Sequence, residues 1–147
     1  MNYLRVKDWP TFQHYSKRRP LWIKLYARLL LDDRFNELDE TKQAQLIKLW
    51  LVVSQSSRFT LDSDDKVVPV IPNDERALRQ AIRSSRKVPI GEFVQDGWLV
   101  EVLESELIDE EIGRSIEHSL AVVKELRGKN VDVYVWEGGS EVVVNDG

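Results

Sequence analysis

The stretch that most limits how this chain can fold is LDETKQAQLIKLWLVVSQSS, residues 38–57. It predicts a helix with Asp39 or Thr41 as the candidate N-cap. Its C-terminal half is apolar almost all round, which is typical of a helix buried in the centre of a domain. We therefore expect this segment to be the central core helix, and its inward positions to be Leu46, Ile47, Trp50 and Val53.

The residues before this helix predict a strand and a further helix. Residues 3–9, YLRVKDW, alternate apolar and charged side chains as a half-buried strand does, and Pro10 should end that strand. A helix is expected over 20–33, because Pro20 suits a first helical turn and the apolar residues after it share one face. That face comprises Trp22, Leu25, Tyr26, Leu29 and Leu30, with Lys24 and Arg28 opposite.

After the core helix, residues 56–72 predict a loop or a short hairpin, and their prolines favour extended or edge-strand structure. A third helix is expected from Asn73 or Asp74, followed by the tight turn SSRKV and a short helical segment over 89–94. Asp96 and Gly97 form a turn signal before a strand that ends near residue 102. The expected inward residues of the third helix are Ala77, Leu78, Ala81 and Ile82.

The sequence changes character after residue 102. Residues 1–100 carry 17 Lys and Arg against 13 Asp and Glu, whereas residues 101–147 carry 4 against 12. A long helix is expected over 104–127, because an apolar stripe runs through it and Gly128 suits a C-cap. Two β-branched runs around EGGS then predict a C-terminal hairpin. The stripe is Leu107, Ile108, Ile112, Ile116, Leu120 and Val123.

We expect two units, a domain over 1–102 and an acidic appendage over 103–147. The long helix must bury its apolar stripe somewhere. It either packs on the first domain or pairs with a second copy as a homodimer, and the sequence leaves both open. A hydrophobic fraction of 42% with five Trp excludes a disordered chain. We assign Trp22, Trp50 and Trp98 to the core, with Tyr3 and Trp9 as candidates for the same role.

Residue types that carry catalysis or bind cofactors are sparse. The chain has no Cys, which excludes disulfides, thiolate metal sites and cysteine nucleophiles. Its two histidines, His14 and His118, lack a partner at ligand spacing, and no phosphate-binding glycine loop is present. The acidic runs at 62–65 and 109–111 are explained by a turn and a helix N-terminus. We expect a non-enzymatic, cytoplasmic protein without cofactor, metal or membrane segment.

The strongest candidates for function are basic residues. Arg76, Arg79 and Arg83 recur at spacings of three and four opposite the apolar face of the third helix, and Arg86 and Lys87 extend them. Such a stripe suits contacts to phosphate, although an ordinary solvated helix face has the same pattern. A second cluster is Lys17, Arg18 and Arg19, preceded by His14 and Tyr15, whose rings could stack on bases.

Several phrases of the sequence resemble a known family. YLRVKDWPTFQHY, RRPLWIKLYARLLLDDRFNEL, LIKLWLVVSQS and VQDGWLVE are similar to the N-terminal domain of phage-encoded replication-initiation (replisome organiser) proteins, over residues 3–102. The resemblance implies a winged helix-turn-helix domain, class α+β, that binds DNA in the cytoplasm of a bacterial host. The matching recognition helix is PIGEFVQ, in which Gln95 alone offers a side chain suited to reading base edges.

Two functions and one regulatory possibility remain open. The first is DNA binding in replication initiation or its regulation, through Arg76, Arg79, Arg83, Arg86 and Lys87. The second is a protein-interaction module whose acidic segment engages a basic protein partner or mimics nucleic acid. Glu92 in the expected recognition helix and the acidic segment favour the second. The regulatory possibility is that the acidic segment covers the basic stripe and inhibits DNA binding.

Overall fold

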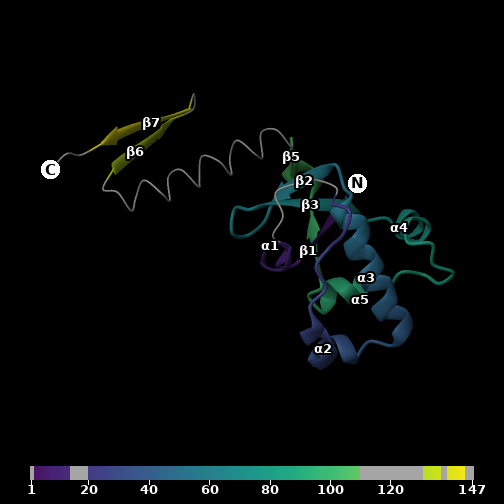
Figure 1. Ribbon diagram of the computed structural model, residues 1–147. Coiled ribbons are helices and arrows are strands. Elements are labelled where there is room, and N and C mark those ends of the chain that lie inside the picture. Colours follow the sequence, from purple (N-terminus) through teal and green to yellow (C-terminus); the bar gives the residue numbers. More distant parts are fainter. Residues whose placement is uncertain (1, 14–19, 110–130, 137–138, 145–147) are drawn as a thin grey trace.

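The chain folds as a mixed α+β protein built on a five-stranded antiparallel sheet. The computed structural model describes residues 2–13, 20–109, 131–136 and 139–144, and Figure 1 shows the labelled elements. Seven strands are present in this described part of the chain: β1 (Tyr3–Val6), β2 (Arg58–Leu61), β3 (Val67–Pro72), β4 (Leu99–Val102), β5 (Leu107–Ile108), β6 (Val131–Trp136) and β7 (Gly139–Val144). The helices are α1 (Trp9–Phe12), η1 (Ala27–Leu31), α2 (Asp33–Asn36), α3 (Glu40–Ser54), α4 (Glu75–Ala81), α5 (Ile90–Gln95) and η2 (Glu104–Glu106).

The main sheet has the order β4-β1-β3-β2-β5, which brings the N-terminal strand to its interior. Tyr3 lies opposite Val102 on one side and opposite Pro72 on the other. Neighbouring residues of a strand face opposite sides of the sheet. Leu4 and Ile71 accordingly belong to the main core, whereas Tyr3 and Val70 belong to a smaller apolar cluster with Val102.

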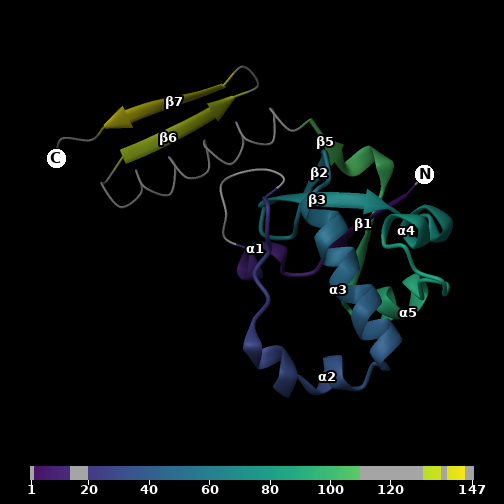
Figure 2. The ribbon, with the colours of Figure 1, turned by 45° about the vertical axis from the view of Figure 1, so that its right-hand side comes forward.

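Helix α3 is the central core helix, as its apolar sequence predicts. It lies across β1 and β3, and Figures 1 and 2 show it running from beside the sheet towards α2. The Asp39 side chain accepts a hydrogen bond from Lys42 N at 2.8 Å, which confirms Asp39 as the N-cap. Leu46, Leu49 and Val53 are fully buried. Trp50 and Trp98 are partly buried against the same core, and Tyr3 and Trp9 are buried, as expected.

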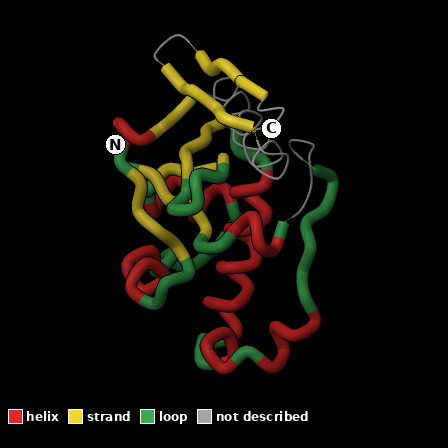
Figure 3. Tube along the Cα trace, turned by 90° about the vertical axis from the view of Figure 1, so that its left-hand side faces the viewer, coloured by secondary structure: helices red, strands yellow, loops and turns green. Residues whose placement is uncertain are grey.

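The helix expected over 20–33 is wrong. Residues 20–26 have no regular helical structure, and only the short helices η1 and α2 follow. Figures 2 and 3 show this segment running along one side of the molecule towards α2. Trp22 is 64% exposed, so its assignment to the core is also wrong. The side chain of Gln55 hydrogen-bonds to the backbone of Pro20, and that of Gln13 to the backbone of Lys24. These bonds to the rest of the fold take the place of intrahelical hydrogen bonds, which are only marginally stable in a short isolated helix.

The N-terminal strand is shorter than expected, since β1 ends at Val6 and Trp9 starts α1. Asp8 has a φ of 58°, which turns the chain there, and Pro10 lies in the first turn of α1 where proline is tolerated. Residues 56–72 form a hairpin, one of the two expected structures. Strand β3 is an inner strand rather than the expected edge. Pro69 lies opposite Phe59 of β2, outside the register with β1, and Pro72 is the last residue of β3, opposite Tyr3.

The later elements of the first domain mostly follow the sequence. Asp74 caps α4 by accepting from Ala77 N at 3.1 Å, and Leu78 and Ile82 are buried. Ala81, the last residue of α4, is exposed, contrary to the expectation. Helix α5 and strand β4 lie where they were predicted, and the turn between them contains Gly97 with a φ of 80°.

The expected helix over 104–127 does not begin as predicted. Residues 104–106 form the 3-10 helix η2, and Leu107 and Ile108 form β5, which pairs with β2. Leu107 packs against the cluster of Tyr3, Val70 and Val102. The chain therefore remains in the main sheet beyond residue 102. Ile112, Ile116, Leu120 and Val123 lie outside the described residues, as does the 109–111 run after Asp109.

The predicted C-terminal hairpin is confirmed, because β6 and β7 pair from Val131 opposite Val144 to Trp136 opposite Gly139. In the part of the chain that the structure describes, no helix has both the length and the apolar character needed to cross a membrane.

Candidate nucleic-acid interface

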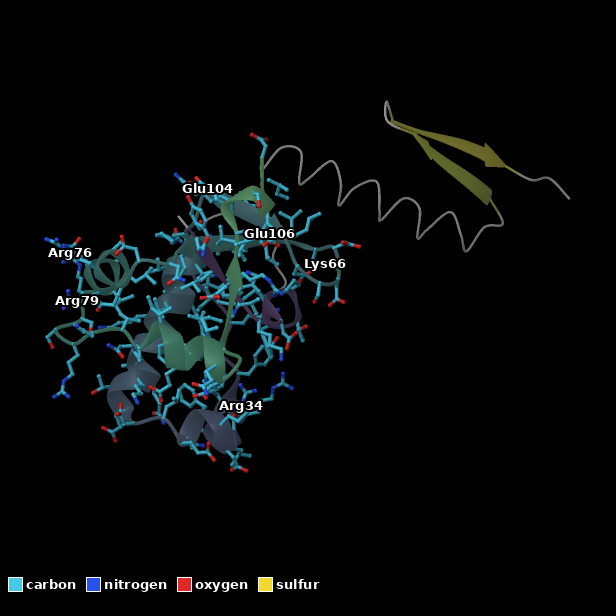
Figure 4. The ribbon with its side chains drawn as sticks, turned by 180° about the vertical axis from the view of Figure 1, so that it is seen from behind. Arg34, Lys66, Arg76, Arg79, Glu104 and Glu106 are labelled. Atoms are coloured by element: carbon cyan, nitrogen blue, oxygen red, sulfur yellow. The ribbon has the colours of Figure 1, made fainter. Side chains whose placement is uncertain are left out.

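Helix α4 presents the first two predicted basic residues. Leu78 and Ile82 fix its inner side in the core, and the opposite side carries Arg76 and Arg79. Figure 4 shows both arginines on the outer side of α4. Arg76 is exposed, whereas Arg79 is half-buried and its Nε lies 3.5 Å from Glu75 Oε1. Glu75 thus partly compensates Arg79, while Arg76 has no carboxylate partner among the described residues.

The segment between α4 and α5 carries three more basic residues. Arg83, Arg86 and Lys87 are all exposed, and they lie in the turn that follows α4. Arg83 has a φ of 54°, the left-handed conformation that commonly ends a helix. Arg76, Arg79, Arg83, Arg86 and Lys87 are called the basic surface below.

The backbone of this turn is held from the core by Gln45. Its Nε2 donates to Lys87 O at 3.0 Å, to Arg86 O at 3.3 Å and to Ser84 Oγ at 3.2 Å. Gln45 is 3% exposed, so these bonds are sheltered from water. From the other side, Val88 N donates to Glu75 Oε1 at 3.1 Å. The turn is therefore a fixed frame from which the cationic side chains extend.

Gln45 was missed by the sequence reading, although a signal was available. It lies one helical turn before Leu49, on the buried side of α3. A polar side chain at such a position must have buried hydrogen-bond partners. What the sequence could not supply was the identity of those partners, which lie about forty residues further along the chain.

Replacing Gln45 by Leu is expected to lower the free energy of unfolding by about 1–3 kcal/mol, because Lys87 O loses its donor and Arg86 O keeps only the Ser84 hydroxyl. Urea unfolding followed by circular dichroism measures the change. Gln80→Leu is the matched control, because Gln80 is exposed on α4 and should change stability by under about 0.5 kcal/mol. Equal losses at both positions would contradict the buried frame.

Helix α5, the expected recognition helix, offers little to nucleic acid. Phe93 is fully buried, and Glu92 pairs with Lys42 of α3, whose Nζ lies 2.8 Å from Glu92 Oε2. The hydrogen bond that Lys42 Nζ donates to Glu92 Oε1 raises the pKa of Lys42. This ion pair holds α5 against α3, and Lys42 compensates the charge of the Glu92 carboxylate, which would otherwise repel phosphate.

Gln95 is the last residue of α5 and is exposed there, at the end of the helix away from the turn that carries Arg86 and Lys87. The next residue, Asp96, accepts a hydrogen bond at its carbonyl oxygen from Arg34 Nη2. Figure 4 shows Arg34 well separated from Arg76 and Arg79. Among the described residues, no hydrogen bond or ion pair joins Gln95 to the basic surface.

The second predicted cluster, Lys17, Arg18 and Arg19 with His14 and Tyr15, lies outside the described residues. The residues on both sides of it are anchored: the Gln13 side chain makes two hydrogen bonds of 2.9 Å with the backbone of Lys24, and Gln55 Nε2 donates to Pro20 O at 2.9 Å.

The acidic run at 62–65 forms the turn of the β2–β3 hairpin, as expected. Asp62 Oδ1 accepts from the backbone N of Asp64 and of Lys66, both at 2.9 Å, and Asp65 has a φ of 58°. Within the described residues, no group of three or more His, Asp or Glu side chains is placed to hold a metal ion. These carboxylates serve to close the turn.

The fold and the basic surface define a mixed α+β protein with a cationic turn fixed on a helical frame. Comparison with known proteins finds no match to any family model, curated protein or solved structure.

Proposed function

We propose that this chain is a non-enzymatic DNA-binding protein, of phage origin, that acts in replication initiation or its regulation inside the bacterial host. The observation that carries the proposal is the cluster of exposed cations formed by Arg76 on α4 and by Arg83, Arg86 and Lys87 on the turn that Gln45 and Glu75 hold. A rigid cationic edge suits the regularly spaced phosphates of a duplex, because little conformational entropy of the backbone is lost on binding.

The proposed contacts are to phosphate and carry no sequence information. Reading of base edges needs Arg, Lys, Asn or Gln on the element that enters the groove. In α5, Glu92 is bound to Lys42, and Gln95 is the last residue, at the end of the helix away from the basic turn. We therefore infer binding that depends on charge and duplex shape rather than on base sequence.

We further propose that the first domain is of the winged-helix type, as the resemblance implies. The helix-turn-helix pair is then α4 and α5, with α3 as the supporting helix and β4 as the strand that follows. The connection 82–89 is longer than the three or four residues usual in this motif. Arg83, Arg86 and Lys87 lie in this longer connection, so we infer that contact is made by the turn and the adjacent side of α4 instead of the second helix.

The test is a fluorescence anisotropy titration of the full chain against a labelled duplex at salt concentrations from 50 to 200 mM. Four phosphate contacts predict a slope of about −3.6 in log affinity against log salt, which is a loss of roughly 150-fold across that range. Duplexes of unrelated sequence should bind alike. Absence of binding to any duplex or single strand at 50 mM salt would contradict the proposal.

The exposed apolar side chains of residues 21–31 favour a second candidate, a protein-interaction module. Large apolar residues rarely cluster on the surface of a monomer without a partner. A complex captured from host lysate that survives nuclease treatment, together with absence of DNA binding, would favour this function. The residues are Leu21, Trp22, Leu25, Leu30 and Leu31, each more than half exposed.

A further inference from the structure

A cavity of about 330 Å³ lies between the segment 20–32 and the body of the first domain. Five aromatic residues line it, and they come from α1, the segment itself, α3 and the turn before β4. Its volume is at the lower end of the range of small-molecule sites, roughly 300–1,000 Å³. The aromatic residues are Trp9, Phe12, Tyr26, Trp50 and Trp98.

The outer wall of the cavity is held in place by specific hydrogen bonds. The side-chain amide of Gln13 both donates to Lys24 O and accepts from Lys24 N, each at 2.9 Å. Tyr26 Oη donates to Phe12 O at 3.3 Å, and the two rings pack edge to face with centroids 5.9 Å apart. The aromatic surfaces are thus positioned before any ligand arrives.

Cationic side chains also line the cavity. The Arg28 guanidinium lies 5.0 Å from the centre of the Tyr26 ring and 5.6 Å from that of Phe12. Arg34 lies 4.6 Å from the centre of the Trp98 ring. Lys7 and Lys24 complete the set, and two lining carboxylates, Asp8 and Asp32, offset part of its charge. No described carboxylate makes an ion pair with any of these four cations.

Trp50 contributes its ring, and not its ring nitrogen, to the lining of the cavity. Trp50 Nε1 has no hydrogen-bond partner among the described residues, but it is buried and does not face a cavity that admits water-sized molecules. The aromatic rings and the cations therefore favour a ligand with an aromatic ring and a negative charge.

We propose that this cavity binds one nucleotide unit. The base packs among the aromatic rings, and the phosphate is held by the exposed cations Lys7, Arg28 and Arg34. A free mononucleotide and an unpaired nucleotide of a single strand share this chemistry. The cavity and the basic surface have no residue in common, so either proposal can fail without the other.

Isothermal titration calorimetry of the full chain with thymidine monophosphate, and separately with a ten-residue oligothymidylate, tests the site. Saturable binding of the mononucleotide identifies a free nucleotide as the source, and binding of the oligonucleotide alone identifies a single strand. Thymidine, which lacks the phosphate, should bind at least several-fold more weakly than its monophosphate. Absence of saturable binding with both phosphate-bearing probes overturns the proposal.

Two variants connect that binding to the cavity. Trp50→Leu removes one of the aromatic rings of the lining, and should weaken binding about tenfold. Arg28→Gln changes an exposed residue, so the fold is preserved, and should weaken the monophosphate or oligonucleotide but not thymidine. The matched control is Arg86→Gln on the basic surface, which should leave mononucleotide affinity unchanged. Affinities equal to the native value in both cavity variants would overturn the assignment.

Discussion

Neutralising Arg83, Arg86 and Lys87 together by Gln is expected to reduce duplex affinity about 500-fold at 0.1 M salt. Each phosphate contact contributes about −0.9 to the slope of log affinity against log salt, so the loss of three contacts makes the slope less negative by about 2.7. At 0.1 M salt this corresponds to a fall in affinity by a factor of about 500. The slope of log affinity against log salt should fall from about −3.6 to about −0.9. Anisotropy titration across a salt series measures both quantities on the same samples.

The control for this triple variant is Lys66→Gln. Lys66 is exposed at the tip of the β2–β3 hairpin, and Figure 4 shows it on the opposite side of the molecule from Arg76 and Arg79. A duplex bound at the basic surface does not reach it, so affinity and slope should stay within error. The stability of the triple variant should also be unchanged, because all three side chains are exposed. An unchanged slope in the triple variant would rule out the basic surface as the contact.

Trp9→Ala is expected to lower the free energy of unfolding by about 3–5 kcal/mol, whereas Trp22→Ala should change it by under about 0.5 kcal/mol. The substitution is the same, but Trp9 is 6% exposed within the main core and Trp22 is 64% exposed. Removing the buried ring loses its packing and leaves a cavity, while removing the exposed ring loses little burial. Denaturant unfolding followed by circular dichroism avoids the loss of fluorescence that both variants cause.

This comparison also decides between the two structures of residues 20–33. The amphipathic pattern predicts a helix with Trp22 inward, and in that case both variants would lose several kcal/mol. Leu25→Ala, a neighbouring position that is 53% exposed, should behave as Trp22→Ala does. A large loss at Trp22 and Leu25 would support the helix and contradict the extended segment described above.

A truncation that removes the acidic segment should end the chain beyond β5, and not at the boundary near residue 102 that the sequence predicts. Ending the chain at residue 103 would remove β5, whose Leu107 pairs with Thr60 and packs on the cluster of Tyr3. A gain or loss of DNA binding after such a cut would mix the effect of charge with damage to the sheet. Ending the chain after Asp109 retains β5 and isolates the charge of the remaining segment.

The difference between correct and wrong expectations follows from the range of the interactions. Asp39 and Asp74 were recognisable as caps because the bonds they accept come from residues three positions away. The strand at Leu99–Val102 was recognisable from the Asp96-Gly97 turn beside it. Residues 20–33 have an equally clear helical pattern, yet contacts to Gln13 and Gln55, distant in sequence, hold part of the segment in another conformation.

By itself, the sequence determined the α+β class, the central helix α3, the positions of α4, α5 and β4, and the run of basic residues over 76–87, because each depends on local periodicity, caps and turns. Only the tertiary structure decided that Gln45 fixes the basic turn, that Lys42 holds Glu92, and that five aromatic residues surround one cavity. Each of these joins residues far apart along the chain. Burial makes such pairings selective, since an unpaired polar group in the core is costly, and the partner is known only once the chain has folded.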